Sequence, residues 1–439
     1  MSSVRTIILT VFLTLSLWQS MDKWRTLESL ETFCDSPQSF DPPFASSGES
    51  MTSTALTVTG SFRYNRTKNS PLRYPPGRQY LTPALKPFLG EHRPDADAIF
   101  AMATGYEIDD HLITIGSLLN TSYQGDVVLG IQEWKNCSTQ LQAFLTYHAQ
   151  HTHLVVYTLP PCRKLNPDPF GHPRCFTTHA YVNPFWDNNP ASKPYNRLTG
   201  NDMAGRNQSP RKFRYEYYWI WQRHYEPASR IWIVDFRDLV FQTNPMEHWS
   251  LQNTGPTTLH LFEESELRRI TEVERFTGSM IRDFFGPGMI DRIGNKTVLC
   301  SGVSMGGKIA MEQYLLMMIW HMDNVLGNKI GKGDQAHHNV LYYLGELANQ
   351  EGIDDIQVWK NFRGAVANTG YTYRLEGMKK ADVLDVDGNV IPIVHQFDRS
   401  KSLNSYVKTK RSTIWQPQAE ALIGVDLTYV LPKGAKKPS

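Results

Sequence analysis

The sequence predicts an α/β fold, built as a single large domain around a central, mostly parallel sheet. Apolar strand-like segments alternate with helix-like segments between residues 97 and 159, a pattern typical of right-handed β-α-β units. Further along, residues 231–234 are all apolar, as expected for a strand buried on both faces of a parallel sheet. The 439 residues are enough to bury a sizeable core.

The first half of the predicted domain alternates regularly between strands and helices. Residues 107–119 carry apolar side chains at helical spacing, and Ser138 is a suitable N-cap for the next helix. We expect strands at residues 97–105, 126–131 and 153–159, and helices at 107–119 and 138–150.

The second half begins after residues 160–210, which are rich in Pro, Asn and Gly and show no regular pattern. A loop of this length in a compact domain is usually functional or disordered. We then expect helices at residues 211–225, 278–285, 308–324 and 334–347, strands at 231–234, 258–262, 297–307 and 391–394, and a hairpin at 383–390 that turns at Asp387-Gly388.

The chain also suggests three segments outside this domain, which itself covers residues 96–412. Residues 1–21 contain an uncharged apolar run, which we interpret as a cytoplasmic end with an uncleaved signal-anchor; the alternative is a cleaved signal peptide. Residues 22–95 are rich in Ser, Thr and Pro and are expected to form a stem or an irregular wrapping segment, and residues 413–439 a C-terminal tail.

Glycosylation acceptors support routing through the secretory pathway. Asn-x-Ser/Thr motifs occur at Asn65, Asn120, Asn136, Asn207 and Asn295. The five cysteines are Cys34, Cys137, Cys162, Cys175 and Cys300, of which Cys162 and Cys175 flank a loop that a disulfide would close. The odd number leaves at least one thiol free or paired with another chain. A formal net charge of +2 excludes binding to nucleic acid through a broad basic face.

The residues with the clearest chemistry follow the buried strand at 231–234. Asp235 and Asp238 stand three apart with Arg237 between them, and in an α/β sheet ligands bind at the carboxyl ends of the strands. Two carboxylates there need a cation or an arginine to offset their repulsion. Mg²⁺ or Mn²⁺ prefers such oxygen ligands, so a metal that holds a phosphate-bearing substrate is our interpretation. The alternative is a turn whose aspartates cap the following segment.

The helix at 211–225 leads into that strand. Its aromatic residues at helical spacing are more typical of a core than of a ligand platform. Arg211 and Arg214 at its start suit a diphosphate, because a helix N-terminus and guanidinium groups both attract anions.

Taken in order, these segments resemble the GT-A-fold glycosyltransferases of the secretory pathway, over about residues 96 to 400. The resemblance rests on a first strand ending in Thr104-Gly105, the acidic motif at Asp235, a Ser-Gly strand, an Asp-Gln helix start and a late histidine. It implies a domain with a Rossmann-like nucleotide-binding half. It also implies that Thr104 and Gly105 lie at the nucleoside end of the cleft.

The resemblance implies a metal site and a donor site. The family's acidic motif is commonly Asp-x-Asp; here the second acid is displaced, so Asp238 is either a metal ligand or the partner of Arg237, while Asp235 and His395 transfer as ligands. The donor-sugar strand would be Ser301-Gly302, preceded by Cys300 where the family has Asn. Asp334 and Gln335 would face the donor sugar and the acceptor.

The expected chemistry is sugar transfer from a nucleotide sugar. A metal would stabilise the charge on the departing diphosphate, helped by Arg211, Arg214 or Arg237. An inverting enzyme also needs a carboxylate base, for which Asp334 is the candidate; the alternative role of Asp334 is a helix N-cap.

We therefore expect a metal-dependent glycosyltransferase, formally a hexosyltransferase, with Mn²⁺ or Mg²⁺ as cofactor. Its donor would be a UDP- or GDP-sugar and its acceptor a glycan, glycoprotein or glycolipid. The expected location is the Golgi or ER membrane, as a single-pass type II protein with a lumenal catalytic domain.

Two other function classes fit parts of the sequence. Residues 302–306 match the Gly-x-Ser-x-Gly nucleophile elbow of α/β-hydrolases, with Ser304 as nucleophile and Asp334 or Asp385 and His395 following in the required order. A non-catalytic, lectin-like or scaffolding protein is the third class, and it would leave the acidic motif without a role.

Overall fold

The computed structural model describes residues 61–63, 86–159, 210–265, 268–272, 274–324, 333–370 and 382–428. The chain divides into two compact units, Met1–Val58 and Thr59–Ser439, and all described residues belong to the second. The signal-anchor, most of the stem, the loop at 160–209, the end of the tail, Cys34, Asn65, Cys162, Cys175 and Asn207 lie outside the described residues. Within the described residues, no helix has both the length and the apolar character needed to cross a bilayer.

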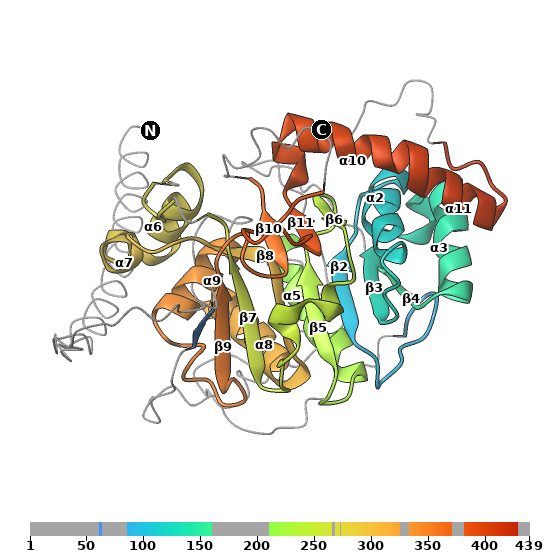
Figure 1. Cartoon of the computed structure of the whole chain (residues 1–439). Coiled ribbons are helices and arrows are strands. Elements are labelled where there is room, and N and C mark those ends of the chain that lie inside the picture. The colour runs from blue at the N-terminus through green and yellow to red at the C-terminus, as the bar shows by residue number, and fades with distance from the viewer. Residues whose placement is uncertain are drawn as a thin grey trace, which may run out of the picture. The chain divides into compact units, whose positions relative to one another are not determined.

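The described part of the second unit is an α/β fold around a mixed, mostly parallel sheet of eight strands (Figure 1). In spatial order the strands are β1 (Ser61–Arg63), β9 (Asp355–Trp359), β7 (Thr258–Glu263), β8 (Leu299–Gly307), β5 (Arg230–Val234), β2 (Ala98–Met102), β3 (Asp126–Ile131) and β4 (Leu154–Thr158). The β5-β2-β3-β4 half and the β7–β9 pair are parallel, whereas β8 runs antiparallel to both of its neighbours. The predicted fold class is thus confirmed.

A second sheet of three short strands lies beside the end of β5. It consists of β10 (Val366–Asn368), β11 (Ile393–His395) and β6 (Leu239–Phe241), in that order. Since β6 starts directly after Asp238, and β11 ends at His395, this sheet brings two predicted metal ligands together: Leu239 and His395 are register partners.

Helices cover both faces of the main sheet. They are α2 (Ile108–Leu119), α3 (Thr139–His151), α5 (Pro210–Trp221), α6 (Ser279–Phe285), α7 (Pro287–Ile293), α8 (Lys308–Asn324), α9 (Asp334–Tyr343), α10 (Lys401–Lys410) and α11 (Gln416–Ile423). Strand β5 shows why its sequence is apolar throughout. Ile231 and Ile233 pack into the core formed with α5 and α8, and Trp232 and Val234 into the core formed with α2 and α3.

Most predicted elements are confirmed within a few residues. Ser138 caps α3 as expected, its hydroxyl accepting a hydrogen bond from the Leu141 backbone N–H at 3.3 Å. The predicted hairpin at 383–390 is reduced to one bridge between Leu384 and Val390 around a tight turn. The predicted stem contributes the edge strand β1, which pairs with β9.

The C-terminal boundary differs from the prediction. The segment expected to be a tail from residue 413 contains α11, and Trp415 is buried against α2, where Gly116 leaves room for its Cβ. In Figure 1, α10 and α11 lie along α2 and α3. Pro417 lies in the first turn of α11, where proline is tolerated.

Candidate metal centre

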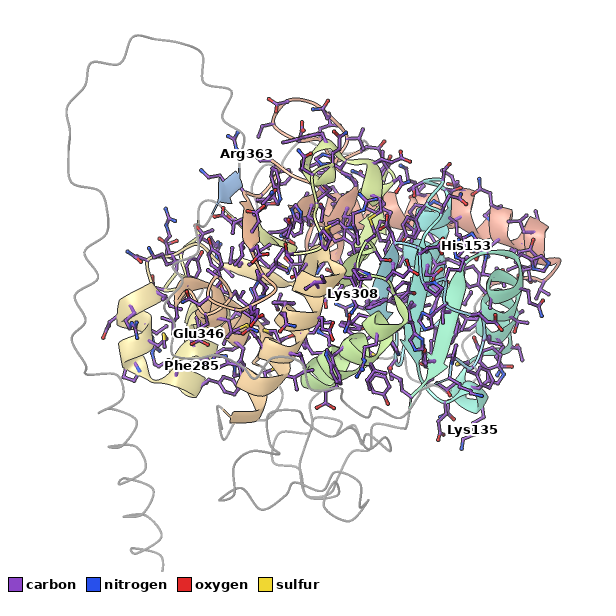
Figure 2. The ribbon with its side chains drawn as sticks, turned by 90° about the horizontal axis from the view of Figure 1, so that it is seen from below. Lys135, His153, Phe285, Lys308, Glu346 and Arg363 are labelled. Atoms are coloured by element: carbon purple, nitrogen blue, oxygen red, sulfur yellow. The ribbon has the colours of Figure 1, made fainter. Side chains whose placement is uncertain are left out.

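Three elements converge at the carboxyl end of β5. Asp235 directly follows this strand, and its backbone N–H donates to the Gly302 carbonyl of β8 at 2.6 Å. Asp238 and His395 come from the small sheet. At the opposite end of the main sheet, Lys308 begins α8 and His153 precedes β4; both are labelled in Figure 2.

The side chains of Asp235, Asp238 and His395 point at one another. His395 Nε2 lies 3.5 Å from Asp235 Oδ2 and 3.7 Å from Asp238 Oδ1. Each of the three offers one ligand atom, these atoms all lie within 4.8 Å of one another, and no other group of three His, Cys, Asp or Glu in the described residues is so arranged. His395 Nε2 is buried and has no hydrogen-bond partner. An unpartnered imidazole nitrogen facing two carboxylates fits a divalent cation such as Mn²⁺ or Mg²⁺.

Protonation competes with a cation at this centre. Burial raises the pKa of Asp235, but the Arg214 guanidinium and His395 outweigh it and hold that pKa well below its usual value. Burial raises the pKa of Asp238, and the Asp235 carboxylate adds to the effect. Burial alone would lower the pKa of His395, but Cys300 and the neighbouring carboxylates raise it above its ordinary value. A cation would therefore displace protons here and bind better as the pH rises.

Arg214 joins the metal centre to the start of α9. Its guanidinium pairs with Asp235 Oδ1, with Asp334 Oδ2 at 2.8 Å and with the Ser301 carbonyl at 3.2 Å. It was predicted to bind diphosphate, and the structure shows it engaged by two carboxylates instead. Arg211 lies in the first turn of α5, and its side chain is outside the described residues.

The predicted Asp-Gln pair begins α9. The N-cap is Gly333, so Asp334 is the first helical residue and not the cap; its Oδ1 accepts from the Gln335 backbone N–H at 3.0 Å.

The Gln335 amide is fully bonded within the protein. Its oxygen accepts from the Ser301 backbone N–H and hydroxyl, and its nitrogen donates to the Leu299 carbonyl and to Glu264. An amide has two donors and two acceptor positions, and Gln335 uses all of them, three on β8 and one on Glu264.

Glu264 is a site residue that the sequence reading missed. It follows β7, is buried, and accepts from Gln335 Nε2 at 3.1 Å. Burial raises its pKa to about 7, against the opposing effects of His395 and Gln335. The signal was present, since Glu264 follows an apolar strand at the same sheet edge as Asp235.

Arg237 does not pair with Asp238, as one reading of the motif supposed. Arg237 donates to Asp398 at 3.0 Å and is half exposed, whereas Asp238 faces Arg399 at 3.3 Å. Arg399 is thus a second missed residue, and it follows the predicted ligand His395 in the chain after Gln396, Phe397 and Asp398.

Thr104 and Gly105, predicted to end the first strand, lie in the turn that follows β2 at the same edge of the sheet. The Gly105 N–H donates to Gln132 Oε1 at 2.7 Å, and the Thr104 hydroxyl to the Gly130 carbonyl at 3.3 Å. Next to them, the Tyr106 ring stacks on Phe236, which follows Asp235, with ring centroids 5.8 Å apart. The turn is therefore connected to the metal centre through two aromatic rings.

The Ser-Gly strand, β8, packs too closely against the metal centre to carry a side chain at position 302. A Cβ on Gly302 would lie 2.6 Å from both Asp235 Oδ2 and His395 Cε1. The strand thus packs directly against the metal centre, and Cys300 Sγ lies 3.4 Å from His395 Nδ1.

The hydrolase alternative is wrong for this structure. Ser304 lies in the middle of β8, fully buried, with Ile233 and Leu261 as its register partners. A nucleophile elbow requires a sharp turn that exposes the serine. The other proposed acid, Asp385, lies in the turn at 385–389 and accepts from Asp387 and Asn389.

The similarity of the chain to known proteins is low. No protein-family model matches the chain, and no curated protein does either. Among solved structures, the chain is similar to the bifunctional glycosyltransferase WbbM, with a TM-score of 0.40 and 8% identity over 76% of this chain and 53% of that one. It is similar to the glycosyltransferase GlyE of Streptococcus pneumoniae, with a TM-score of 0.35 and 12% identity over 78% of this chain and 66% of that one.

A third similar structure is the galactosyltransferase LgtC in complex with donor and acceptor sugar analogues. Its TM-score is 0.36 and its identity 11%, over 76% of this chain and 98% of that one. Because all these values are low, we base the functional proposal on the residues of the site.

Gly302→Ala should disrupt the metal centre without unfolding the protein. The added methyl group must displace Asp235 or His395, so we expect Mn²⁺ affinity to fall at least about tenfold, as for a disturbed ligand shell. Gly288→Ala is the matched control, because a Cβ there meets nothing within 4 Å. Isothermal titration with Mn²⁺ measures both, and equal affinities would contradict the close packing at Gly302.

Glu264→Gln should change how stability depends on pH. The pKa of Glu264 is raised to about 7 in the folded protein, so between about pH 4.5 and 7 the folded state keeps a proton that the unfolded state has released. The wild-type free energy of unfolding should therefore fall over this range by up to about 3 kcal/mol more than that of the variant.

Chemical denaturation at pH 5 and pH 8 in EDTA measures this difference. Glu226→Gln, at an exposed carboxyl, is the control. A constant difference between Glu264→Gln and wild type at both values would show that Glu264 ionises normally.

Proposed function

We propose that the protein is a metal-dependent glycosyltransferase that moves a hexose from a UDP- or GDP-sugar to a glycan, glycoprotein or glycolipid. The observation that carries the proposal is the cluster of Asp235, Asp238 and His395 at the carboxyl end of β5, with the unpartnered His395 Nε2 facing both carboxylates. Carboxylates and an imidazole at this edge of an α/β sheet suit a cation that holds a diphosphate.

Different residues of the site would bind the metal and the donor sugar. Asp235, Asp238 and His395 would hold Mn²⁺ or Mg²⁺, which when bound supplies Lewis-acid stabilisation to a departing diphosphate. Arg214 keeps the Asp235 and Asp334 carboxylates a fixed distance apart by pairing with both. The sugar would lie between them, over the backbone of Ser301 and Gly302.

Two buried carboxyl groups are candidates for deprotonating the acceptor hydroxyl, if the reaction inverts. Asp334 already accepts a hydrogen bond from Arg214 at 2.8 Å, so its carboxylate is engaged within the protein. Glu264, with its pKa raised to about 7, is better matched to proton transfer near neutral pH.

We also propose that this is a type II protein of the Golgi or ER membrane with a lumenal catalytic domain. The apolar run at 6–20 supports an anchor. The sequons at Asn120, Asn136 and Asn295 are all exposed, which makes them suitable glycan acceptors.

Protein from a eukaryotic secretory host should shift in mass on treatment with an amidase that removes N-glycans, and Asn→Gln at the three sites should reduce the shift. If the amidase leaves the mass unchanged both in the wild type and in the Asn→Gln variants, that result would count against lumenal exposure.

A thermal-shift screen against UDP- and GDP-sugars, with Mn²⁺ and with EDTA, tests the activity class. A ligand that binds only the folded state raises the melting temperature. At a ligand concentration of one hundred times its Kd, it adds about 2.7 kcal/mol to the free energy of unfolding. We expect a shift with one nucleotide class, in Mn²⁺ only, that is lost in Asp235→Ala. Asp385→Ala, which removes a carboxylate from the turn at 385–389, should keep it. A nucleotide shift that persists in EDTA and in Asp235→Ala would contradict the proposal.

A further inference from the structure

A buried pair of asparagines stands behind His395, on the side away from the carboxylates. Asn368 ends β10, is fully buried, and is the register partner of His395 on β11. Its Oδ1 lies 2.8 Å from His395 Nδ1. Asn361 lies in the segment between β9 and β10 and is also buried.

The orientation of the Asn361 amide is set by backbone groups, whose donor and acceptor roles are unambiguous. Asn361 Oδ1 accepts from the Asn368 backbone N–H at 2.9 Å. Asn361 Nδ2 donates to the Asn368 carbonyl at 2.8 Å and to the Glu264 carbonyl at 2.6 Å. A flipped amide would place its N–H₂ against an N–H and its oxygen against two carbonyls.

The Asn368 amide is fixed in the same way. Its Nδ2 donates to the Glu263 carbonyl at 2.9 Å, so Oδ1 must be the atom that faces His395. A carbonyl oxygen only accepts hydrogen bonds, so the proton of this contact belongs to His395 Nδ1.

This arrangement decides which imidazole nitrogen is available to a cation. In a neutral imidazole only one nitrogen carries a proton, and when that is Nδ1 the lone pair is on Nε2. Nε2 is the nitrogen that faces Asp235 and Asp238. Histidines that bind metals commonly donate their second N–H to such an acceptor.

We propose that Asn368, oriented by Asn361, is a positioning residue that holds His395 in the tautomer with Nε2 free to bind a divalent cation. The inference rests on the proposed metal-dependent function and adds to it a pair of residues outside the ligand set. When a cation takes Nε2, the remaining imidazole proton sits on Nδ1, where the Asn368 oxygen accepts it. Without that oxygen, the metal-bound imidazole loses the hydrogen bond that fixes its tautomer and its orientation.

The same pair also joins the small sheet to the end of β7, through the Glu263 and Glu264 carbonyls. Substitutions at Asn368 are therefore expected to lower stability as well. The test has to separate a loss of stability from a loss of metal affinity.

The experiment measures the Mn²⁺ dissociation constant of the full chain by isothermal titration, after metal removal, for wild type, Asn368→Leu and Asn368→Asp. Asn368→Leu removes the amide acceptor and leaves Nδ1 only the weak sulfur acceptor Cys300 Sγ at 3.4 Å, so we expect affinity to fall by about 10- to 100-fold. Asn368→Asp keeps an acceptor for Nδ1–H but loses the donor to Glu263, so its stability should fall while its affinity stays within about threefold of wild type.

Val366→Ala is the matched control, because Val366 lies on the same strand and pairs with Ile393 rather than with His395. It should lower the melting temperature and leave Mn²⁺ affinity unchanged. If Asn368→Leu does not fold, Asn368→Ala replaces it with the same expectation.

The outcomes separate this inference from the proposed function. Wild-type affinity in Asn368→Leu, or an equal loss in Asn368→Leu and Asn368→Asp, would overturn the positioning role and leave the metal site standing. A wild-type protein that binds no Mn²⁺ would overturn the metal site and, with it, the inference.

Discussion

The arrangement of the site depends on compensating the charge of the two carboxylates that follow β5, Asp235, which is partly buried, and Asp238, which is buried. Asp235 and Asp238 are brought close together where a strand leaves the sheet, and carboxylates in such a place are costly unless positive groups face them. Arg214 from α5 and His395 from β11 supply that charge to Asp235, and Arg399 to Asp238. Each of these partners belongs to a different part of the chain. The need for compensation therefore links α5, the small sheet and the turn after β11 to one end of one strand.

Close packing turns this electrostatic requirement into a defined geometry. Gly302 leaves no room for a side chain between β8 and the Asp235–His395 pair. Gln335 ties the start of β8 to α9 and to Glu264 with all of its hydrogen-bonding groups. Groups that are held in this way need little rearrangement when a ligand arrives, which favours both binding and catalysis.

The sequence predicted the parts of this account that depend on local pattern. The apolar strand at 231–234, followed by Asp235, predicted the central strand and the acidic site. His395 was predicted only through the resemblance to GT-A-fold glycosyltransferases, because a single histidine at a strand end is by itself more often structural. Strand direction could not be read in this way. Residues 302–306 fit a nucleophile elbow in sequence, and only the antiparallel pairing of β8 shows that Ser304 is in the middle of a strand.

Roles that depend on a distant partner were also beyond the sequence. Arg214 was predicted to bind a diphosphate. Nothing in the local sequence shows that Asp334, 120 residues away, is its partner. Glu264, Asn361 and Asn368 carry no motif, and their importance comes from the atoms that surround them. The direct test of the central claim is a crystal soaked in Mn²⁺, measured for anomalous scattering. The account predicts a peak within coordination distance of Asp235, Asp238 and His395 Nε2, and a crystal saturated with Mn²⁺ that shows no peak there would contradict it.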